Sequence, residues 1–338
     1  MATFRADVVG SFLRPKELLD ARQRGVGGMA LREIEDQAIR DVIQLQEEVG
    51  IPVVTDGEFR RGHWTHLVME IAEGFELIDG FPVPVNRLKQ RASVIDAEFA
   101  FIRSQTDRPI KMTLPQPTAL GLLWREDLSS GAYPTRAAFV DEVSALLNRE
   151  AQALAAAGAA YLQLDAPQYT VAPPETTSDE YRGMVKTDRR VFDGVAKAVT
   201  AVHLCRGNYR RSVDGPATPY GPYAEAIFGS FDVDRLLLEY DDYQAGDFSP
   251  LRHVPENVTV VLGLVTTKWP TLEQEDELIE RINAATAYVP LDRLAISPQC
   301  GFSSLATLQN VTSEIQRAKL ELVVRVAERV WGTADIGS

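Results

Sequence analysis

Two cysteines and a histidine in this 338-residue sequence have the types and spacing that bind a soft metal ion. His203-Leu204-Cys205 ends a short apolar run, and side chains two residues apart in a strand point to the same side. The other cysteine, Cys300, follows a later apolar run, and Glu239 ends a third. Two thiolates, one imidazole and one carboxylate would form a tetrahedral zinc site in which one ligand is displaceable by substrate.

A simpler interpretation of these residues needs no metal. Cysteine is often a small buried hydrophobe and a histidine in a strand is often hydrogen-bonded in the core, which is the better reading of an isolated His-x-Cys. Two cysteines are also too few for a disulfide scaffold. Residues that bind zinc occur at the ends of three separate predicted strands, and this coincidence favours the metal site over the alternative.

The elements that would position these residues recur along the whole chain. Eight short apolar or β-branched runs are each followed by a segment with helical periodicity, the pattern of parallel strands with crossover helices. No repeat, low-complexity stretch or linker divides the chain. We therefore predict one α/β domain over residues 1–338, a single (β/α)8 TIM barrel. The predicted strands are residues 7–10, 51–55, 110–113, 160–164, 201–204, 235–239, 258–262 and 293–297.

Four helices are well marked by their apolar spacing and their ends. Gly50 and Gly158 end two of them as C-terminal glycines, and Thr312 or Ser313 is an N-cap for the last. Two stretches rich in glycine or proline, residues 75–86 and 208–223, follow strands and are predicted to be loops on the catalytic face. The predicted helices are residues 31–49, 137–157, 273–286 and 313–330.

Reactive side chains gather at the ends of the predicted strands. In a barrel these ends converge on one face, so the side chains there would surround one site, whereas a solvated surface would scatter its charges. The residues are Ser11, Asp56, Glu58, Gln116, Asp165, His203, Cys205, Glu239, Asp241, Asp242 and Cys300.

Composition narrows the class of protein. There are 35 Lys and Arg against 48 Asp and Glu, so the net charge of −13 argues against a nucleic-acid partner. With 45% hydrophobic and 25% charged residues, the chain is typical of a globular protein. No stretch approaches the roughly 18 apolar residues of a membrane helix, and the N-terminus lacks the apolar core of a signal peptide. We expect a cytoplasmic protein with no membrane partner.

Six segments, in order, resemble the C-terminal catalytic barrel of the cobalamin-independent methionine synthases, most closely the family's short single-barrel members. In that family a zinc ion held by His, Cys, Glu and Cys activates the thiol of homocysteine. The resemblance implies the ligands His203, Cys205, Glu239 and Cys300, the same four that the strand ends select. The segments are residues 9–15, 55–61, 164–167, 203–208, 238–242 and 297–301.

The resemblance also implies a reaction and its residues. Zinc would hold homocysteine as a thiolate for methyl transfer, with Glu239 as the ligand that yields. Ser11 would hold the amino-acid carboxylate, and Glu58 and Asp165 the ammonium group. From spacing alone, Ser11 could instead be a helix N-cap, Asp165 an Asx turn, and Glu58 the partner of a nearby arginine.

The methyl donor, the oligomeric state and the acceptor stay open at this level. His63-Trp64 and Trp124 could stack a folate pterin, but the donor could equally be a corrinoid protein or another methylated compound, and a homo-oligomer is not excluded. An epoxyalkane:coenzyme M transferase would use a similar zinc and would need Arg60, Arg61 or Arg206 to bind a sulfonate. A zinc hydrolase is disfavoured because two thiolates make zinc a poor activator of water. A non-catalytic scaffold with a structural zinc is also disfavoured, because structural sites usually take ligands closer in sequence than residues 205, 239 and 300.

Overall fold

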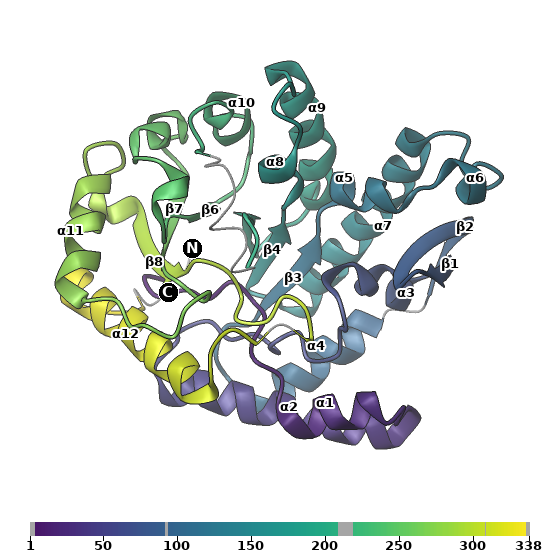
Figure 1. Cartoon of the computed structure of the whole chain (residues 1–338), viewed down its shortest axis with the longest axis horizontal. Helices are drawn as coiled ribbons and strands as arrows, with labels where there is room; N and C mark the ends of the chain where they lie inside the picture. The colour runs from purple at the N-terminus through teal and green to yellow at the C-terminus, as the bar shows by residue number, and fades with distance from the viewer. Residues whose placement is uncertain (1–3, 92–93, 209–218, 308, 336–338) are drawn as a thin grey trace.

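A six-stranded parallel sheet forms the centre of the molecule (Figure 1). The computed structural model describes residues 4–91, 94–208, 219–307 and 309–335. The strands follow one another in chain order around the sheet and match the last six predicted runs. They are β3 (Lys111–Pro115), β4 (Tyr161–Asp165), β5 (Val199–Leu204), β6 (Arg235–Glu239), β7 (Thr259–Val265) and β8 (Leu294–Pro298).

The barrel is closed by three isolated parallel bridges. The first two predicted runs occupy the remaining strand positions, but each pairs with its neighbours only at single residues. The predicted TIM barrel is confirmed, whereas extended strands over residues 7–10 and 51–55 are not found. The bridges join Ala6 to Ile296, Ser11 to Gly57 and Val54 to Ile110.

The second run departs from a regular strand for a local reason. Pro52 has no N–H to give to a ladder. The N–H of Thr55 donates to Gln46 Oε1 (3.0 Å), and Gln46 Nε2 donates to the carbonyl of Thr55 (2.8 Å). A buried side chain of a helix therefore takes the place of a neighbouring strand.

The predicted helices are confirmed with small shifts at their ends. Gly50 and Gly158 follow two of them with φ of 88° and 103°, and the Thr312 hydroxyl accepts the N–H of Ile315. The helices are α1 (Lys16–Gln23), α2 (Gly28–Glu48), α3 (Leu67–Ile71), α4 (Val94–Gln105), α5 (Pro117–Leu120), α6 (Glu126–Ser129), α7 (Arg136–Ala157), α8 (Gln168–Val171), α9 (Ser178–Asp188), α10 (Ala224–Phe228), α11 (Glu275–Ala285) and α12 (Ser313–Trp331).

The loop predicted over residues 75–86 is wrong, because this segment is a β-hairpin. β1 (Ala72–Ile78) pairs antiparallel with β2 (Phe81–Gln90), and the hairpin projects to one side near α6 (Figure 1). Asp79 and Gly80 form its turn with φ of 54° and 82°, the left-handed pair that favours hairpins. The Asp-Gly signal outweighs the prolines of β2. Of the second predicted loop, residues 209–218 lie outside the described residues.

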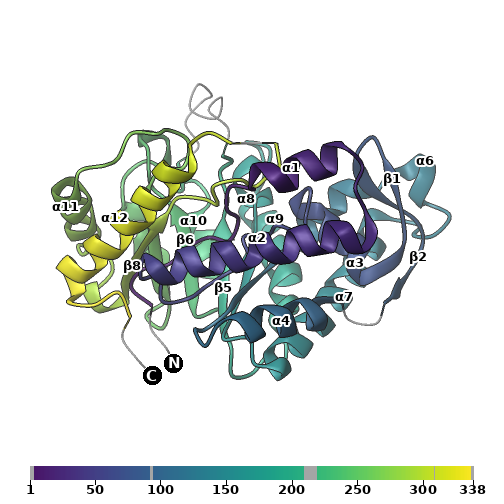
Figure 2. The ribbon, with the colours of Figure 1, turned by 90° about the horizontal axis from the view of Figure 1, so that it is seen from below.

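Side chains of the strands alternate between the barrel interior and the layer under the helices. Tyr161, Ala201 and Leu237 belong to the inner cluster, whereas their neighbours Leu162 and Val202 pack in the outer one. Figure 2 shows α2 and α12 on the outside of the barrel, joined by an ion pair between Glu48 and Arg317 (2.9 Å). Among the described residues, none of the helices combines the length and apolar composition needed to span a bilayer.

Candidate metal centre and its cavity

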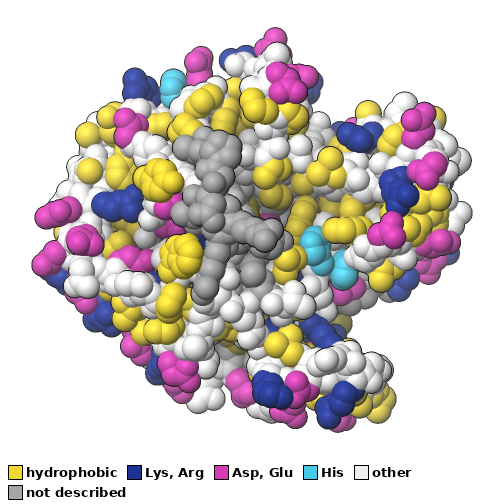
Figure 3. Space-filling model, in the orientation of Figure 1, with side chains coloured by type: hydrophobic (Ala, Val, Ile, Leu, Met, Phe, Trp, Pro, Cys, Tyr) yellow, Lys and Arg dark blue, Asp and Glu magenta, His cyan; other side chains and the backbone are white. Residues whose placement is uncertain are grey.

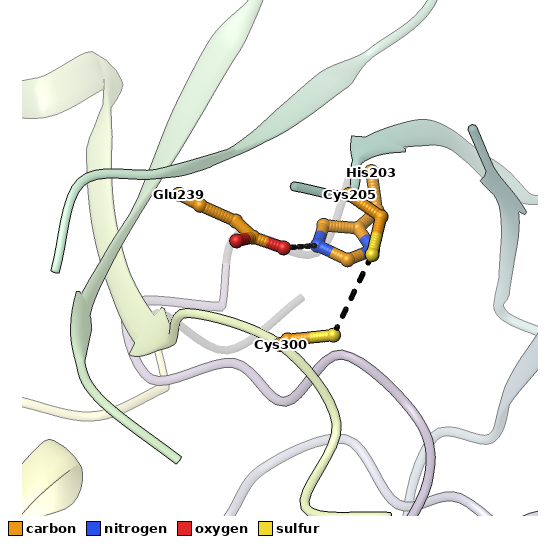
Figure 4. A group of neighbouring side chains, drawn as sticks. All are labelled: His203, Cys205, Glu239 and Cys300. Atoms are coloured by element: carbon orange, nitrogen blue, oxygen red, sulfur yellow. Dashed lines mark hydrogen bonds and ion pairs between the residues drawn. The ribbon is translucent and has the colours of Figure 1, made fainter. Parts of the chain in front are cut away.

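The four predicted metal ligands meet at the carboxyl ends of three strands (Figure 4). His203 is the last residue but one of β5, and Cys205 follows that strand. Glu239 ends β6, and Cys300 follows β8. One ligand atom from each residue lies within 4.8 Å of the others. The alternation of side chains along β5 and β6 turns these groups to the barrel interior, as the sequence predicted.

Short contacts link the four side chains to each other. His203 Nε2 is 3.3 Å from Glu239 Oε1, and the Cys205 and Cys300 sulfurs, both free thiols, are 3.8 Å apart. The N–H of Arg206 donates to Glu239 Oε1 (3.0 Å), and that of Gly207 to the Cys205 sulfur (3.4 Å). The backbone after β5 therefore helps to hold two of the ligands.

The donor set fits a zinc ion. Glu239 is fully buried, and its Oε2 atom has no hydrogen-bond partner among the described residues, a costly state for a carboxylate. Burial opposes a charge on His203, but hydrogen bonds to Asp165 and Glu239 raise its pKa well above the ordinary value. Contact with Cys205, followed by burial, raises the pKa of the Cys300 thiol. A soft cation would satisfy these crowded acidic groups together.

The four residues line or adjoin a cavity of about 200 Å³. All three predicted substrate contacts, Ser11, Glu58 and Asp165, lie in its wall. Among the described lining residues, none is a lysine or an arginine. The remaining lining residues are Val9, Trp64, Pro167, Val171, Gly207, Asn208, Gly301, Ser304 and Leu305, with His203, Cys205 and Cys300 from the metal centre.

Glu58 is held in an unusual backbone conformation. Its φ of 59° lies in the left-handed region, which is uncommon for a residue with a side chain. Its Oε1 accepts the hydroxyl of Thr113 (2.9 Å) and lies 4.0 Å from Arg61 Nη1. Burial, partly opposed by Arg61, raises the pKa of Glu58. Strain and burial at one carboxyl group in a cavity wall are typical of a functional residue.

Asp165 and Ser11 are far apart in the sequence but line the same cavity. Asp165 pairs in register with His203, and its Oδ1 lies 3.3 Å from His203 Nδ1. Ser11 is 4% exposed and is not an N-cap, since α1 starts after Pro15. A Cβ on Gly301 would lie 2.0 Å from Ser11 Oγ, so only glycine allows this approach.

Four strand-end candidates do not reach the cavity. Asp56 Oδ1 accepts the N–H of Glu58 in an Asx turn (2.9 Å). Gln116 donates to the buried Asp188 (2.7 Å). Asp241 and Asp242 form ion pairs with Lys268 at 3.2 and 2.9 Å. These groups support the loops around the cavity.

Two residues of the cavity wall, Ser304 and Leu305, are not among the sequence predictions, and the two tryptophans take different positions. Ser304 and Leu305 follow β8 as Cys300 does, which is the signal that could have found them. Trp124 packs inward and donates to the carbonyl of Tyr133 (3.0 Å). Trp64 lines both this cavity and a second one of about 330 Å³ beside the hairpin.

The second cavity lies on the face shown in Figure 3, where histidine side chains border the hollow beside the hairpin. His63 stacks edge-on against Phe81 of β2, with ring centroids 5.5 Å apart. Burial lowers the pKa of His63 to about 4, so its ring is neutral at physiological pH. The hollow therefore has an uncharged aromatic wall on the Trp64 side.

Comparisons with known proteins agree with this arrangement. The family model described as the cobalamin-independent synthase catalytic domain matches residues 4–329. YxjG of Bacillus subtilis, whose function is recorded as uncharacterised, is 36% identical over 97% of this chain and 95% of its own length. Methionine synthase of Pyrococcus abyssi is 26% identical over 97% of this chain and 95% of its own.

A solved structure from Listeria monocytogenes, of a protein assigned as a vitamin-B12-independent methionine synthase, superimposes with a TM-score of 0.77. It is 29% identical, and the match covers 98% of this chain and 99% of that one. The family match thus spans the barrel and all four residues of the metal centre. The chain belongs to the cobalamin-independent methionine synthase family.

Proposed function

We propose that this protein is a zinc-dependent methyltransferase that methylates homocysteine to methionine. The observation that carries the proposal is the meeting of His203, Cys205, Glu239 and Cys300 within 4.8 Å at a cavity. Bound zinc lowers the pKa of a thiol, so that a sulfur nucleophile exists at neutral pH. Glu239 would be the ligand that yields to the substrate, because a thiolate ligand is softer than a carboxylate.

The cavity wall supports an amino-acid thiol as the acceptor. Asp165 and Glu58 supply two carboxyl groups for an ammonium group, and Ser11 supplies a hydroxyl for a carboxylate. Burial favours the neutral form of Glu58. An ammonium group placed beside this carboxyl group would have the opposite effect and favour its charged form. These substrate roles are supported by the placement of the three side chains around one cavity.

The coenzyme M alternative finds less support. It requires an arginine at the far end of the thiol, and the three predicted arginines are engaged elsewhere. Arg60 Nη2 donates to Asp36 (2.8 Å), and Arg61 Nη1 to the Thr113 hydroxyl (2.9 Å). The Arg206 side chain is 4% exposed, with Asp242 at 3.7 Å and its guanidinium over the Tyr220 ring. None of these three side chains lines the cavity of the metal centre.

The methyl donor would approach beside Trp64. This side chain lines both the cavity of the metal centre and the second cavity, so it offers an aromatic face on which a donor could stack while its methyl group meets the acceptor sulfur. A folate or a corrinoid methyl group could both enter from this side.

We also propose that residues 1–338 form a single catalytic domain. One hydrophobic cluster includes residues from Ala6 near the start of the chain to Ala334 near its end. Phe4 and Asp335 pair in an antiparallel bridge, so the two ends of the described chain meet. Limited proteolysis should release no stable fragment that keeps a folded half of the barrel.

The function is tested by zinc content and by methyl transfer with matched acceptors. We expect one zinc per chain and methionine from homocysteine with 5-methyltetrahydrofolate or methylcobalamin as donor. Asp165→Asn should weaken homocysteine binding by about 1.5–3 kcal/mol, the range for a hydrogen bond to a charged group, while Arg206→Ala should not. Preference of the wild type for coenzyme M, with loss on Arg206→Ala, would overturn the homocysteine assignment.

A further inference from the structure

Gln163 lies beneath the cavity, on the interior side of β4 and two residues before Asp165. It is fully buried and does not line the cavity. Its side chain nevertheless contacts Asp165, since Nε2 donates to Asp165 Oδ1 at 2.8 Å. Gln163 therefore touches the carboxylate that faces both the metal centre and the cavity.

The orientation of the Gln163 amide is fixed by its partners. Lys111 Nζ can only donate, so the atom that it meets at 3.0 Å must be the oxygen Oε1. The nitrogen then donates to two acceptors, the Val9 carbonyl (2.7 Å) and Asp165 Oδ1 (2.8 Å). Lys111 is itself held by Asp7 and by the carbonyl of Val8 (2.6 Å). Turning the amide over would leave all three contacts mismatched.

This arrangement separates the two oxygens of Asp165. Oδ1 receives the Gln163 amide and lies 3.3 Å from His203 Nδ1. No hydrogen bond to Oδ2 is found among the described residues, and the side chain is 20% exposed at the cavity. An Nδ1–H directed at Asp165 leaves His203 Nε2, near Glu239, as the nitrogen for a metal.

We propose that Gln163 is a positioning residue, which holds Asp165 so that Oδ1 orients His203 and Oδ2 faces the substrate amine. The first role depends only on the metal centre. The second role rests on the proposed function, because it needs an amino-acid thiol in the cavity.

Gln163→Met tests the inference, because it keeps the side chain's length and removes the amide. We expect the zinc affinity, measured by chelator competition, to fall by up to about 10-fold, the lower end of the loss for removing a partner of a ligating histidine, because Asp165 is kept but no longer held. Homocysteine binding by the zinc-loaded protein should weaken roughly 2- to 10-fold in calorimetry. In an Asp165→Ala background, Gln163→Met should have no further effect on homocysteine binding, because the acceptor that Gln163 holds is gone.

Gln116→Met is the matched control. Gln116 is also fully buried and near the end of the adjacent β3, and its amide makes hydrogen bonds with Thr118, Asp188 and the N–H of Gln168. We expect this variant to melt at a lower temperature, like Gln163→Met, but to keep the zinc affinity of the wild type. Should Gln163→Met not fold, Gln163→Glu applies the same test, since it keeps the contact with Lys111 and removes the donor.

The two zinc affinities decide the role of Gln163. If Gln163→Met binds zinc and homocysteine as the wild type does, or if Gln116→Met loses the same zinc affinity, Gln163 is only a structural residue and the inference is wrong. If the wild type binds zinc but not homocysteine, the proposed function fails, and the zinc affinities still judge the role of Gln163 toward His203.

Discussion

Two regions of the molecule build the site in different ways. One is formed by the carboxyl ends of β5, β6 and β8, and the other is the segment from residue 4 to residue 61. The metal centre lies at the ends of strands that pair over several residues, so backbone pairing brings its four side chains to one place. Ser11 and Glu58 lie on segments that pair only through single bridges. Regular strand pairing therefore positions the metal-binding residues and Asp165, the laddered half, whereas individual side-chain contacts position Ser11 and Glu58, the bridged half.

Arg14 is the main example of such a contact. It is 3% exposed, and its guanidinium donates to the carbonyls of Glu58 and Arg61 (both 3.0 Å) and to the Ser303 hydroxyl (3.0 Å). One side chain thus ties together the segments after the first, second and eighth barrel positions. Burial lowers the pKa of Arg14 to about 10, so it remains charged at neutral pH.

The largest expected effect breaks the laddered half. Cys300→Ser should lower the zinc affinity by more than about 100-fold, because it removes a ligand, and loss of a ligand's partner already costs about 10- to 100-fold. Methyl transfer should be lost with it. The melting temperature should change little, since the barrel core does not depend on this side chain. Zinc analysis and circular dichroism check both statements, and full zinc retention would remove Cys300 from the centre.

A smaller effect is expected in the bridged half. Arg14→Lys keeps a charge but cannot present a planar fork to its acceptors. It should destabilise the fold by about 1–3 kcal/mol, the cost of buried acceptors left without donors, and weaken homocysteine binding through Glu58. Zinc affinity should stay at the wild-type value. Equal losses of zinc and homocysteine affinity would show that the two halves are not positioned independently.

The most limited effect is on stability alone and concerns Asp188, a buried carboxyl group on the laddered side. Burial raises the pKa of Asp188 to about 6, against hydrogen bonds from Tyr169, Gln116 and Thr118 that lower it. The folded state then binds more protons than the unfolded state between about pH 4 and 6, so stability falls as pH rises through this window. Relative to Asp188→Asn, the wild type should lose about 1–3 kcal/mol of unfolding free energy between pH 4 and 7. Urea titrations measure the difference, and a constant value across this range would contradict the assignment.

Much of the laddered half could be predicted from the sequence. The period-two pattern of β5 placed His203 and Cys205 on one side, and the apolar runs before Glu239 and Cys300 placed both residues at strand ends on the same face of the barrel. The family resemblance selected the same four residues. The helices with glycine ends were predicted for the same reason, since local geometry determines them.

The rest depended on contacts between distant parts of the chain. No local pattern states that Gln46 replaces a strand neighbour at Thr55, or that the Gln163 amide is turned by Lys111. The hairpin over residues 72–90 was missed although its Asp-Gly turn is local, because glycine and proline were weighed as loop residues. Gln116 follows a strand, and the sequence predicted it in the cavity as it did Asp165. Its amide instead donates a hydrogen bond to Asp188.

The sequence by itself predicted the barrel, the four side chains that meet at the strand ends and the carboxyl groups of the cavity wall, because strand periodicity and strand ends are local properties. Only the tertiary structure decided that Gly301 lets Ser11 approach, that Arg14 ties three segments, and that Gln163 contacts Asp165 Oδ1. These features depend on side-chain packing between residues far apart in the chain, for which a single sequence has no spacing rule.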